Sequence, residues 1–235
     1  VAHIGAVGAD GRWAIERLLE YGVDTRHIVE IDVETAQAII AVDTNGENSI
    51  ILHQGANVKI PTHVLEQALT QAETGDTLVF QNETNLQVQA ASLAAKMGLR
   101  VAYAAAPFDS GAVMAVPPYL DFLILNEVEA AQLQDTTGQS PQDIPVKDVI
   151  VTLGAKGATW FGPDGPINVP AHKVTPIDTT GAGDTFTGYV LAGLDRGQPM
   201  LQAMQMASKA AAIMVTRLGT ADVIPDLADV QSFSD

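Results

Sequence analysis

Cysteine is absent from the 235 residues of the sequence, which excludes disulfide bonds, thiolate nucleophiles and cysteine-based zinc or iron–sulfur sites. Aromatic residues are scarce at 5%, whereas apolar residues as a whole make up 47%. The core must therefore consist mainly of Val, Ile, Leu and Ala, as is typical of buried parallel strands that are covered by helices.

Long apolar runs are also absent, since no stretch reaches the roughly 18 residues that a membrane-spanning helix requires. The residues Val1 to Gly5 contain neither a basic region nor a signal-peptide cleavage site. We therefore expect a soluble cytoplasmic protein that does not enter a membrane.

Basic residues are few, because 12 Lys and Arg stand against 28 Asp and Glu and give a formal net charge of −16. A nucleic-acid interface needs a dense cluster of Lys and Arg, and the sequence contains none. We therefore expect no nucleic-acid partner. A phosphorylated ligand would instead have to be held by backbone amides, helix N-termini and metal ions.

From Pro61 onward, short apolar segments alternate with segments of helical spacing. We expect buried strands at residues 77–80, 99–104, 122–125 and 149–153, and long helices at about 183–196 and 200–217. This alternation predicts an α/β fold with a mainly parallel central sheet and helices on both faces, in a single domain spanning residues 1–235. In such sheets, ligands bind beyond the carboxyl ends of the strands.

Before this region, two apolar runs at residues 38–42 and 49–53 flank Asp43-Thr44-Asn45-Gly46. An Asn-Gly pair between alternating strands is a strong hairpin signal. The sequence therefore predicts a small antiparallel β ribbon at about residues 36–55.

The segment richest in candidate functional residues is Gly181-Ala182-Gly183-Asp184, directly before an apolar helix. Small residues let a ligand approach the backbone closely, and the first amide groups of a helix have no partner within it. The segment can therefore form an anion site suited to a phosphoryl group. Asp184, at its edge, could accept a proton from an attacking hydroxyl. Alternatively, the segment is a plain glycine turn in which Asp184 only begins a helix.

The longer string Asp-Thr-Thr-Gly-Ala-Gly-Asp-Thr-Phe-Thr-Gly at 178–188 resembles the C-terminal signature of the ribokinase-type carbohydrate kinase family. Further segments resemble other family motifs in the expected order. They are 126–129 for the N-x-x-E motif, 152–157 for the nucleotide-binding turn and 215–219 for a segment that helps to bind a monovalent cation. The resemblance covers essentially the whole chain. It implies a kinase that transfers a phosphoryl group from ATP to a sugar hydroxyl.

For the transfer itself, the resemblance implies that Asp184 is the catalytic base. The amides of Gly181, Ala182 and Gly183 would stabilise the oxygens of the transferring phosphoryl group. The same resemblance implies a β lid, formed by the ribbon at 36–55, that closes over the sugar and in relatives also makes a dimer contact. A homodimer is therefore expected.

The resemblance also implies a Mg²⁺ ion beside the nucleotide. Asn126 would contact the nucleotide and, with Glu129 acting through water, would organise Mg²⁺ near the phosphates. By themselves, however, these two residues could be the N-cap and a first-turn acid of a helix, each contributing about 0.3–1 kcal/mol.

Further nucleotide and ion contacts follow from the same resemblance. Thr152, Gly154 and Gly157 would line the nucleotide and Ser208 would lie on its adenine side, whereas Lys156 could contact a phosphate or only solvent. The turn at 152–157 could also be a plain connection between strands. A potassium ion would be held by Asp178 and Thr180 together with carbonyl groups of Met214, Arg217 and Gly219.

The acceptor is less closely defined. Glu83 matches a family position that contacts the sugar, although Glu83-Thr84-Asn85 could simply begin a helix. The similarity is greatest to members that phosphorylate ribose, which favours D-ribose as substrate and ribose 5-phosphate as product. Fructokinases, ketodeoxygluconate kinases and adenosine kinase-like enzymes share the same motifs. A non-catalytic regulator that binds a nucleotide or sugar is a further alternative.

The chain departs from the family pattern in two places. Residues 1–7 are predicted to form a strand with no earlier strand beside it, and the sugar-gripping G-G-K-G-A-N-like motif is not found. We therefore expect that an N-terminal segment of the family is absent from this sequence. In addition, the connection from Gln134 to Val149 contains Pro141 and Pro145, so no helix is expected where relatives have one.

Overall fold

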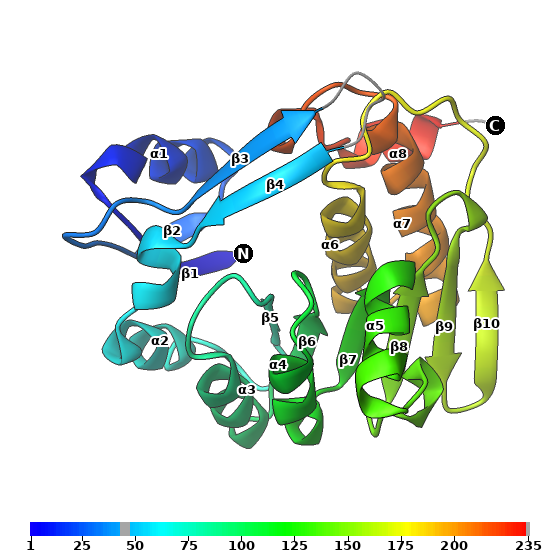
Figure 1. The fold of residues 1–235 in the computed structure, drawn as a ribbon, viewed down its shortest axis with the longest axis horizontal. Helices are drawn as coiled ribbons and strands as arrows, with labels where there is room; N and C mark the ends of the chain where they lie inside the picture. The colour runs from blue at the N-terminus through cyan, green and yellow to red at the C-terminus, as the bar shows by residue number, and fades with distance from the viewer. Residues whose placement is uncertain (43–47, 234–235) are drawn as a thin grey trace.

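A six-stranded sheet lies at the centre of the computed structural model, which describes residues 1–42 and 48–233 (Figure 1). Its strands are β5 (Thr77–Phe80), β6 (Arg100–Ala104), β7 (Phe122–Asn126), β8 (Asp148–Thr152), β9 (Ala158–Gly162) and β10 (Gly165–Val169). The order is β10-β9-β8-β7-β6-β5, with β5 to β8 parallel and the pairs β8–β9 and β9–β10 antiparallel. The predicted α/β class with a mainly parallel sheet is confirmed.

Two smaller sheets precede the central one in the chain. β1 (Ala2–Val7) pairs in parallel with β2 (Asp24–Glu30), and α1 (Arg12–Glu20) connects them. β3 (Gln37–Val42) and β4 (Asn48–His53) form an antiparallel ribbon, as the sequence predicted. The predicted Asn45-Gly46 turn of this ribbon lies outside the described residues.

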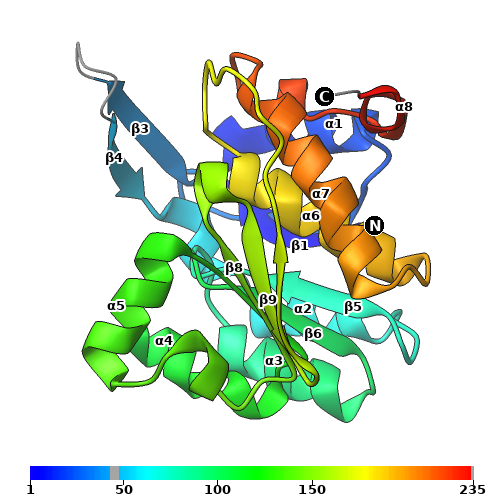
Figure 2. The ribbon, with the colours of Figure 1, turned by 90° about the vertical axis from the view of Figure 1, so that its right-hand side faces the viewer.

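Helices cover both faces of the central sheet. From residue 62 onward the helices are α2 (Thr62–Leu69), α3 (Gln87–Lys96), α4 (Ser110–Ala115), α5 (Glu127–Thr137), α6 (Ala182–Asp195), α7 (Met200–Val215) and α8 (Leu227–Ser232). Of these, α2 contacts β1 and β2, and α8 packs against α7. Helices α3, α4 and α5 lie on one side of the strands, and the pair α6 and α7 lies on the other (Figure 2). The two long C-terminal helices begin and end within two residues of their predicted limits.

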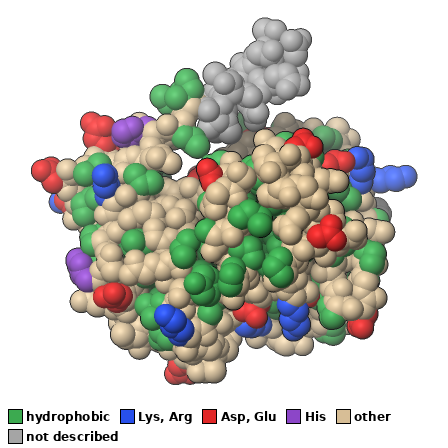
Figure 3. Space-filling view, turned by 60° about the horizontal axis from the view of Figure 1, so that its bottom comes forward, with side chains coloured by type: hydrophobic (Ala, Val, Ile, Leu, Met, Phe, Trp, Pro, Cys, Tyr) green, Lys and Arg blue, Asp and Glu red, His purple; other side chains and the backbone are tan. Residues whose placement is uncertain are grey.

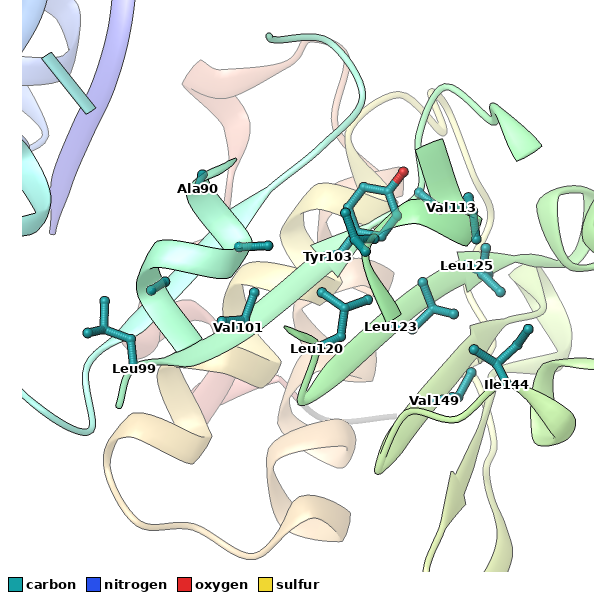
Figure 4. Packing of buried hydrophobic residues seen from close by; sticks show 14 of the residues in the cluster. Ala90, Leu99, Val101, Tyr103, Val113, Leu120, Leu123, Leu125, Ile144 and Val149 are labelled. Carbon is teal, nitrogen blue, oxygen red and sulfur yellow. The ribbon is translucent and has the colours of Figure 1, made fainter. Parts of the chain in front are cut away.

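The strand sequences explain why both faces are buried. In β6, the alternate residues Val101 and Tyr103 belong to the hydrophobic cluster on the α3–α5 side (Figure 4). Ala102 and Ala104, which alternate with them, belong to the cluster that includes α6 and α7. Because successive strand residues point to opposite faces, an uninterrupted apolar run serves two cores at once. The small alanines also leave room for the close approach of the α6–α7 pair.

The surface outside these cores is of mixed character. On the face shown in Figure 3, Lys and Arg side chains are scattered among acidic and apolar ones rather than gathered in a patch. Within residues 1–42 and 48–233, no helix has the length and apolar character needed to cross a membrane.

Five elements were not predicted from the sequence, namely β2, β9, β10, α4 (Ser110–Ala115) and α8 (Leu227–Ser232). Strand β2 is polar along most of its length and buries only His27, whereas β10 is an edge strand that contains Pro166. Such half-exposed strands lack the apolar run that identified the buried ones. As expected, the part of the chain between α5 and β8 contains only one 3₁₀ turn, Pro141–Asp143.

The turn between β8 and β9 generates a prediction about stability. Gly157 has φ +100°, and a Cβ there would lie 2.0 Å from the Val169 carbonyl oxygen. Gly165 has nearly the same φ, +101°, but a Cβ would meet nothing within 4 Å. We expect Gly165→Ala to lower the free energy of unfolding by roughly 1–2 kcal/mol. Gly157→Ala should lower it by more than about 3 kcal/mol, since packing conflict adds to backbone strain.

Urea denaturation of both variants measures the difference. Equal losses of stability would mean that the turn can move away from the strand β10, and the close packing at Gly157 would then not constrain it.

Candidate active site

Candidate residues follow three parallel strands at the point where each strand ends. Gln81 and Glu83 follow β5, Asn126 is the last residue of β7, and Thr152 is the last residue of β8. Asn126 and Thr152 are direct register partners. Because the strands are parallel, all of these residues lie at one edge of the sheet, where ligands of α/β proteins bind.

The N-terminus of α6 lies at the same edge. Gly181 precedes the helix in a left-handed conformation with φ +75°, which a residue with a side chain rarely adopts. The sequence predicted three unpaired amides here, but the N–H of Ala182 donates to the Thr179 carbonyl oxygen at 3.3 Å. Within the described residues, the N–H groups of Gly181 and Gly183 have no acceptor. Two of the three amides therefore remain available to an anion.

Asp184 stands in the first turn of α6 and is exposed. Its Oδ1 accepts a hydrogen bond from Gln81 Nε2 at 2.9 Å. This contact joins residues 103 positions apart in the chain and brings the end of β5 to the start of α6. Gln81 was not predicted as a site residue, because a lone Gln after a strand carries no local functional signal.

Asp184 influences two further carboxyl groups electrostatically. The pKa of Glu83 is raised, first by partial burial and then by the negative charge of Asp184. The pKa of Glu129 is also raised, mainly by burial and additionally by Asp184, while a hydrogen bond from the backbone of Asn126 opposes the shift. The sheet edge therefore concentrates negative charge that the described residues do not neutralise, because the nearby Lys156 pairs with Glu127 instead.

Asn126 and Glu129 form a reciprocal capping box at the start of α5. Asn126 Oδ1 accepts from the Glu129 N–H at 2.8 Å, and Glu129 Oε2 accepts from the Asn126 N–H at 2.8 Å. Asn126 and Glu129 therefore do cap the helix, which is the structural alternative that the sequence offered. It does not account for the burial of Glu129, which is 9% exposed, since a capping carboxylate can remain in solvent.

Two of the predicted nucleotide-lining residues, Gly157 and Ser208, lie against the end of β10 and the segment that follows it. The turn Gly154–Lys156 places Gly157 against the backbone of Val169 and Ala171. The buried hydroxyl of Ser208, on α7, donates to the Pro170 carbonyl oxygen at 3.0 Å. Lys156 extends to the surface, where its Nζ lies 2.8 Å from Glu127 Oε1. This ion pair agrees with the solvent-facing alternative for Lys156.

The predicted potassium ligands come from two segments that lie side by side. Asp178 Oδ1 accepts from the Thr180 N–H at 2.9 Å, and this contact is the main reason why the pKa of Asp178 is lowered. Asp178 also lies 3.5 Å from the Gly219 N–H. The Met214 carbonyl oxygen accepts from the Arg217 N–H, and the Arg217 guanidinium pairs with Asp229. The two segments that carry the predicted oxygen donors are thus neighbours, and the potassium site stays a prediction.

No group of three or more His, Asp or Glu side chains in the described part of the chain is arranged to hold a metal ion. Two surface hollows, of about 890 and 420 Å³, are lined by other residues. The larger follows β1 and β2 and includes four acids, and the smaller lies between β10, α7 and α8. Neither includes Asp184, which is exposed at the edge of the sheet.

An α/β sheet with a carboxylate and a helix N-terminus at the ends of its parallel strands places this chain among the proteins that bind small ligands at a sheet edge. Residues 1–227 match the family model described as pfkB family carbohydrate kinase, so the chain belongs to that family. It is a kinase of the sugar and nucleoside kinase group, as the sequence predicted.

Three relatives illustrate the similarity. A ribokinase from Schizosaccharomyces pombe is 33% identical over 256 aligned residues, which cover 98% of this chain and 78% of that protein. The crystal structure of ribokinase from Cryptococcus neoformans var. grubii serotype A in complex with ADP matches with a TM-score of 0.87 at 31% identity, covering 98% of this chain and 82% of that one. A nucleoside kinase from Burkholderia thailandensis in complex with inosine gives a TM-score of 0.84 at 25% identity, covering 97% and 77%.

The environment of Glu129 generates a second prediction. Because burial raises its pKa in the folded protein above the ordinary value of 4.5, ionisation of Glu129 costs stability. The stabilising contribution is complete below pH 4.5 and is lost as pH rises through the folded-state pKa. Glu129→Gln, whose carbonyl can still accept from Asn126, should therefore raise Tm at neutral pH, and the gain should vanish towards pH 4.5.

Thermal unfolding with a chelator present measures this pH dependence, and Glu127→Gln in the same helical turn is the matched control because Glu127 is exposed. A Tm for Glu129→Gln at or below that of the wild type at neutral pH would contradict a destabilising buried charge.

Proposed function

We propose that this chain phosphorylates a sugar hydroxyl with ATP, with D-ribose as acceptor and ribose 5-phosphate as product. The observation that carries the proposal is the position of Asp184 beside the free amide of Gly183 at the start of α6. This arrangement combines a proton acceptor with an anion site within one helical turn.

In the proposed reaction, the sugar hydroxyl oxygen attacks the γ-phosphorus of ATP and its proton passes to the Asp184 carboxylate. The bond between the γ-phosphorus and the bridging oxygen breaks, and its electron pair leaves with ADP. The amides of Gly181 and Gly183 face the oxygens on which charge develops. Such transfer depends mainly on position and electrostatic stabilisation rather than on covalent chemistry.

A magnesium ion fits the electrostatics of this edge. Glu83 and Glu129 both have raised pKa values beside Asp184, and polyphosphate would add further negative charge. When bound, Mg²⁺ neutralises phosphate charge and orients the oxygens for in-line transfer. Glu129, through water, and Asn126 are the residues that we propose hold it.

Nucleotide binding is supported by the turn at 152–157 and by similarity to the Cryptococcus structure that contains ADP. We propose that Thr152, Gly154 and Gly157 line the nucleotide and that Ser208 supports the adenine side through the Pro170 backbone. We leave Lys156 outside this set, since its ammonium group pairs with Glu127.

The choice of ribose rests on similarity to ribokinases and on Glu83, which reaches the same edge as Asp184. A nucleoside is the second candidate acceptor, favoured by the likeness to the Burkholderia nucleoside kinase with inosine. Both acceptors present a primary hydroxyl on a five-membered sugar, so the same base and anion site could serve either.

The β3–β4 ribbon is proposed as the lid over the acceptor and as the dimer contact. Its residues Ile39, Ile51 and Leu52 are 61%, 63% and 48% exposed, respectively. Apolar side chains this exposed on a two-stranded ribbon favour burial against another surface. A second copy of the chain would provide one.

The first experiment is an ADP-release assay of the full-length protein with Mg²⁺-ATP and potassium, using ribose, deoxyribose, fructose, ketodeoxygluconate, adenosine and inosine. We expect the highest kcat/KM with ribose. Asp184→Asn should lower kcat by about 100-fold or more and leave ATP affinity within a few-fold.

The matched control is Asp164→Asn, which makes the same change at an exposed aspartate between β9 and β10, at the opposite end of the sheet. Near-normal turnover by Asp184→Asn would exclude it as the base. Transfer to a nucleoside in preference to ribose would replace the proposed substrate while keeping the mechanism.

A separate prediction concerns potassium. Because the proposed ligands Asp178, Thr180 and Gly219 adjoin the loop that begins α6, an ion there should order the anion site. We expect kcat to rise when potassium replaces tetramethylammonium at constant ionic strength. Asp178→Asn should reduce that response, and an equal response in wild type and variant would argue against this site.

A further inference from the structure

Gln81 is the only described side chain that forms a hydrogen bond with the Asp184 side chain. It lies directly after β5, is partly buried, and donates from Nε2 to Oδ1 at 2.9 Å. A hydrogen bond to an ionised carboxylate is stronger than one between neutral groups. The contact can therefore hold the Asp184 side chain in one orientation, which its own exposed helical turn would not do.

The neighbouring residue explains why Gln81 is itself held in place. The backbone N–H of Asn82 donates to the Ala106 carbonyl oxygen at 2.9 Å, and its Nδ2 donates to the Pro107 carbonyl oxygen at 2.8 Å. Asn82 Oδ1 accepts from the hydroxyl of Tyr103. Tyr103 is 0% exposed, and its hydroxyl points beyond the strand end in Figure 4.

These contacts fix the direction of the flanking side chains. Asn82 and Glu83 lie in the turn that follows β5, and the hydrogen bonds of Asn82 hold this turn against β6 and the segment after it. Asn82 is engaged on the side of Tyr103, and Gln81 and Glu83 both interact with Asp184 instead. The buried tyrosine therefore secures, through Asn82, a glutamine that is aimed at α6.

We propose, on the basis of the function proposed above, that Gln81 is a positioning residue for the catalytic base. By occupying Oδ1, it leaves Oδ2 of Asp184 directed towards the acceptor hydroxyl. The neutral amide suits this task chemically. A Lys or Arg in the same place would form an ion pair that weakens the base, whereas another acid would repel it.

Surrounding charge makes such positioning necessary. The ionisable side chains that interact with Asp184 are Glu83, from the segment after β5, and Glu129, from α5. Both are acids, so repulsion would turn an unrestrained Asp184 side chain away from the sheet edge and towards solvent. The Gln81 amide opposes that movement.

The test compares two substitutions that keep the length of the side chain. Gln81→Met removes the donor, and Gln81→Glu replaces it with a carboxylate of the same shape. Gln202→Met, at an exposed position on α7, is the matched control. We expect kcat to fall roughly 10- to 100-fold in Gln81→Met, with KM for ATP and Tm close to wild type.

The pH dependence distinguishes positioning from a structural role. At neutral pH the Gln81→Glu variant should be slower than Gln81→Met, because two carboxylates repel. As the pH is lowered, its kcat relative to wild type should rise, since a protonated carboxyl group can again donate to Asp184. The same ratio for Gln81→Met should stay flat, because that substitution adds no titratable group.

A kcat for Gln81→Met within twofold of wild type, or a flat ratio for Gln81→Glu, would overturn the proposal. A joint fall of kcat and Tm would assign Gln81 a structural role only, and would overturn it equally.

The contact is also measurable without turnover. The side-chain NH₂ signals of Gln81, identified by their loss in Gln81→Met, should move in the ¹H–¹⁵N NMR spectrum of Asp184→Ala and not in that of Asp164→Ala. No movement means that the contact is absent and the positioning role is wrong. Movement together with a wild-type protein that phosphorylates no acceptor would place the failure in the proposed function instead.

Discussion

The parallel alignment of β5, β7 and β8 is the constraint on which the candidate site depends. Parallel strands bring their carboxyl ends to one edge, so Gln81, Asn126 and Thr152 meet there although they are distant in sequence. The helix α6 lies on the same sheet because its residues Phe186 and Val190 belong to one buried cluster with alanines of β6. The hydrogen bond from Gln81 to Asp184 then joins the two layers at the point where the chemistry is proposed to occur.

This convergence has an electrostatic consequence. In a chain with a net charge of −16, the edge of the sheet gathers Glu83, Glu129 and Asp184, and the pKa values of the two glutamates rise. Groups arranged for folding stability alone would be paired with cations, as Lys156 and Glu127 are at the surface. Unpaired acids around a helix N-terminus instead favour a site that binds a ligand together with cations. Such sites commonly lower the stability of the fold.

Local sequence features were sufficient to predict the buried strands, the long helices and the glycine segment before Asp184, because each has a strong short-range pattern. Two kinds of feature could not be predicted from the sequence. Strands β2, β9 and β10 are polar or carry Gly and Pro, so their identity depends on the sheets that they join. The proposed role of Gln81 depends on its hydrogen bond to Asp184, 103 positions away in the chain. The hydrogen bond from Ala182 to Thr179 depends on the geometry of a single turn. Neither contact can be recognised from a local sequence pattern.

The capping box of α5 shows that structural and functional explanations of the same residues do not compete. Asn126 and Glu129 satisfy two backbone N–H groups that the helix leaves unpaired. Those bonds also fix the Glu129 carboxyl group in a buried position near Asp184. An exposed cap would stabilise the helix equally well without raising the pKa of its own carboxylate. The cap therefore explains how Glu129 is held, and the charge at the sheet edge explains why a buried acid is useful there.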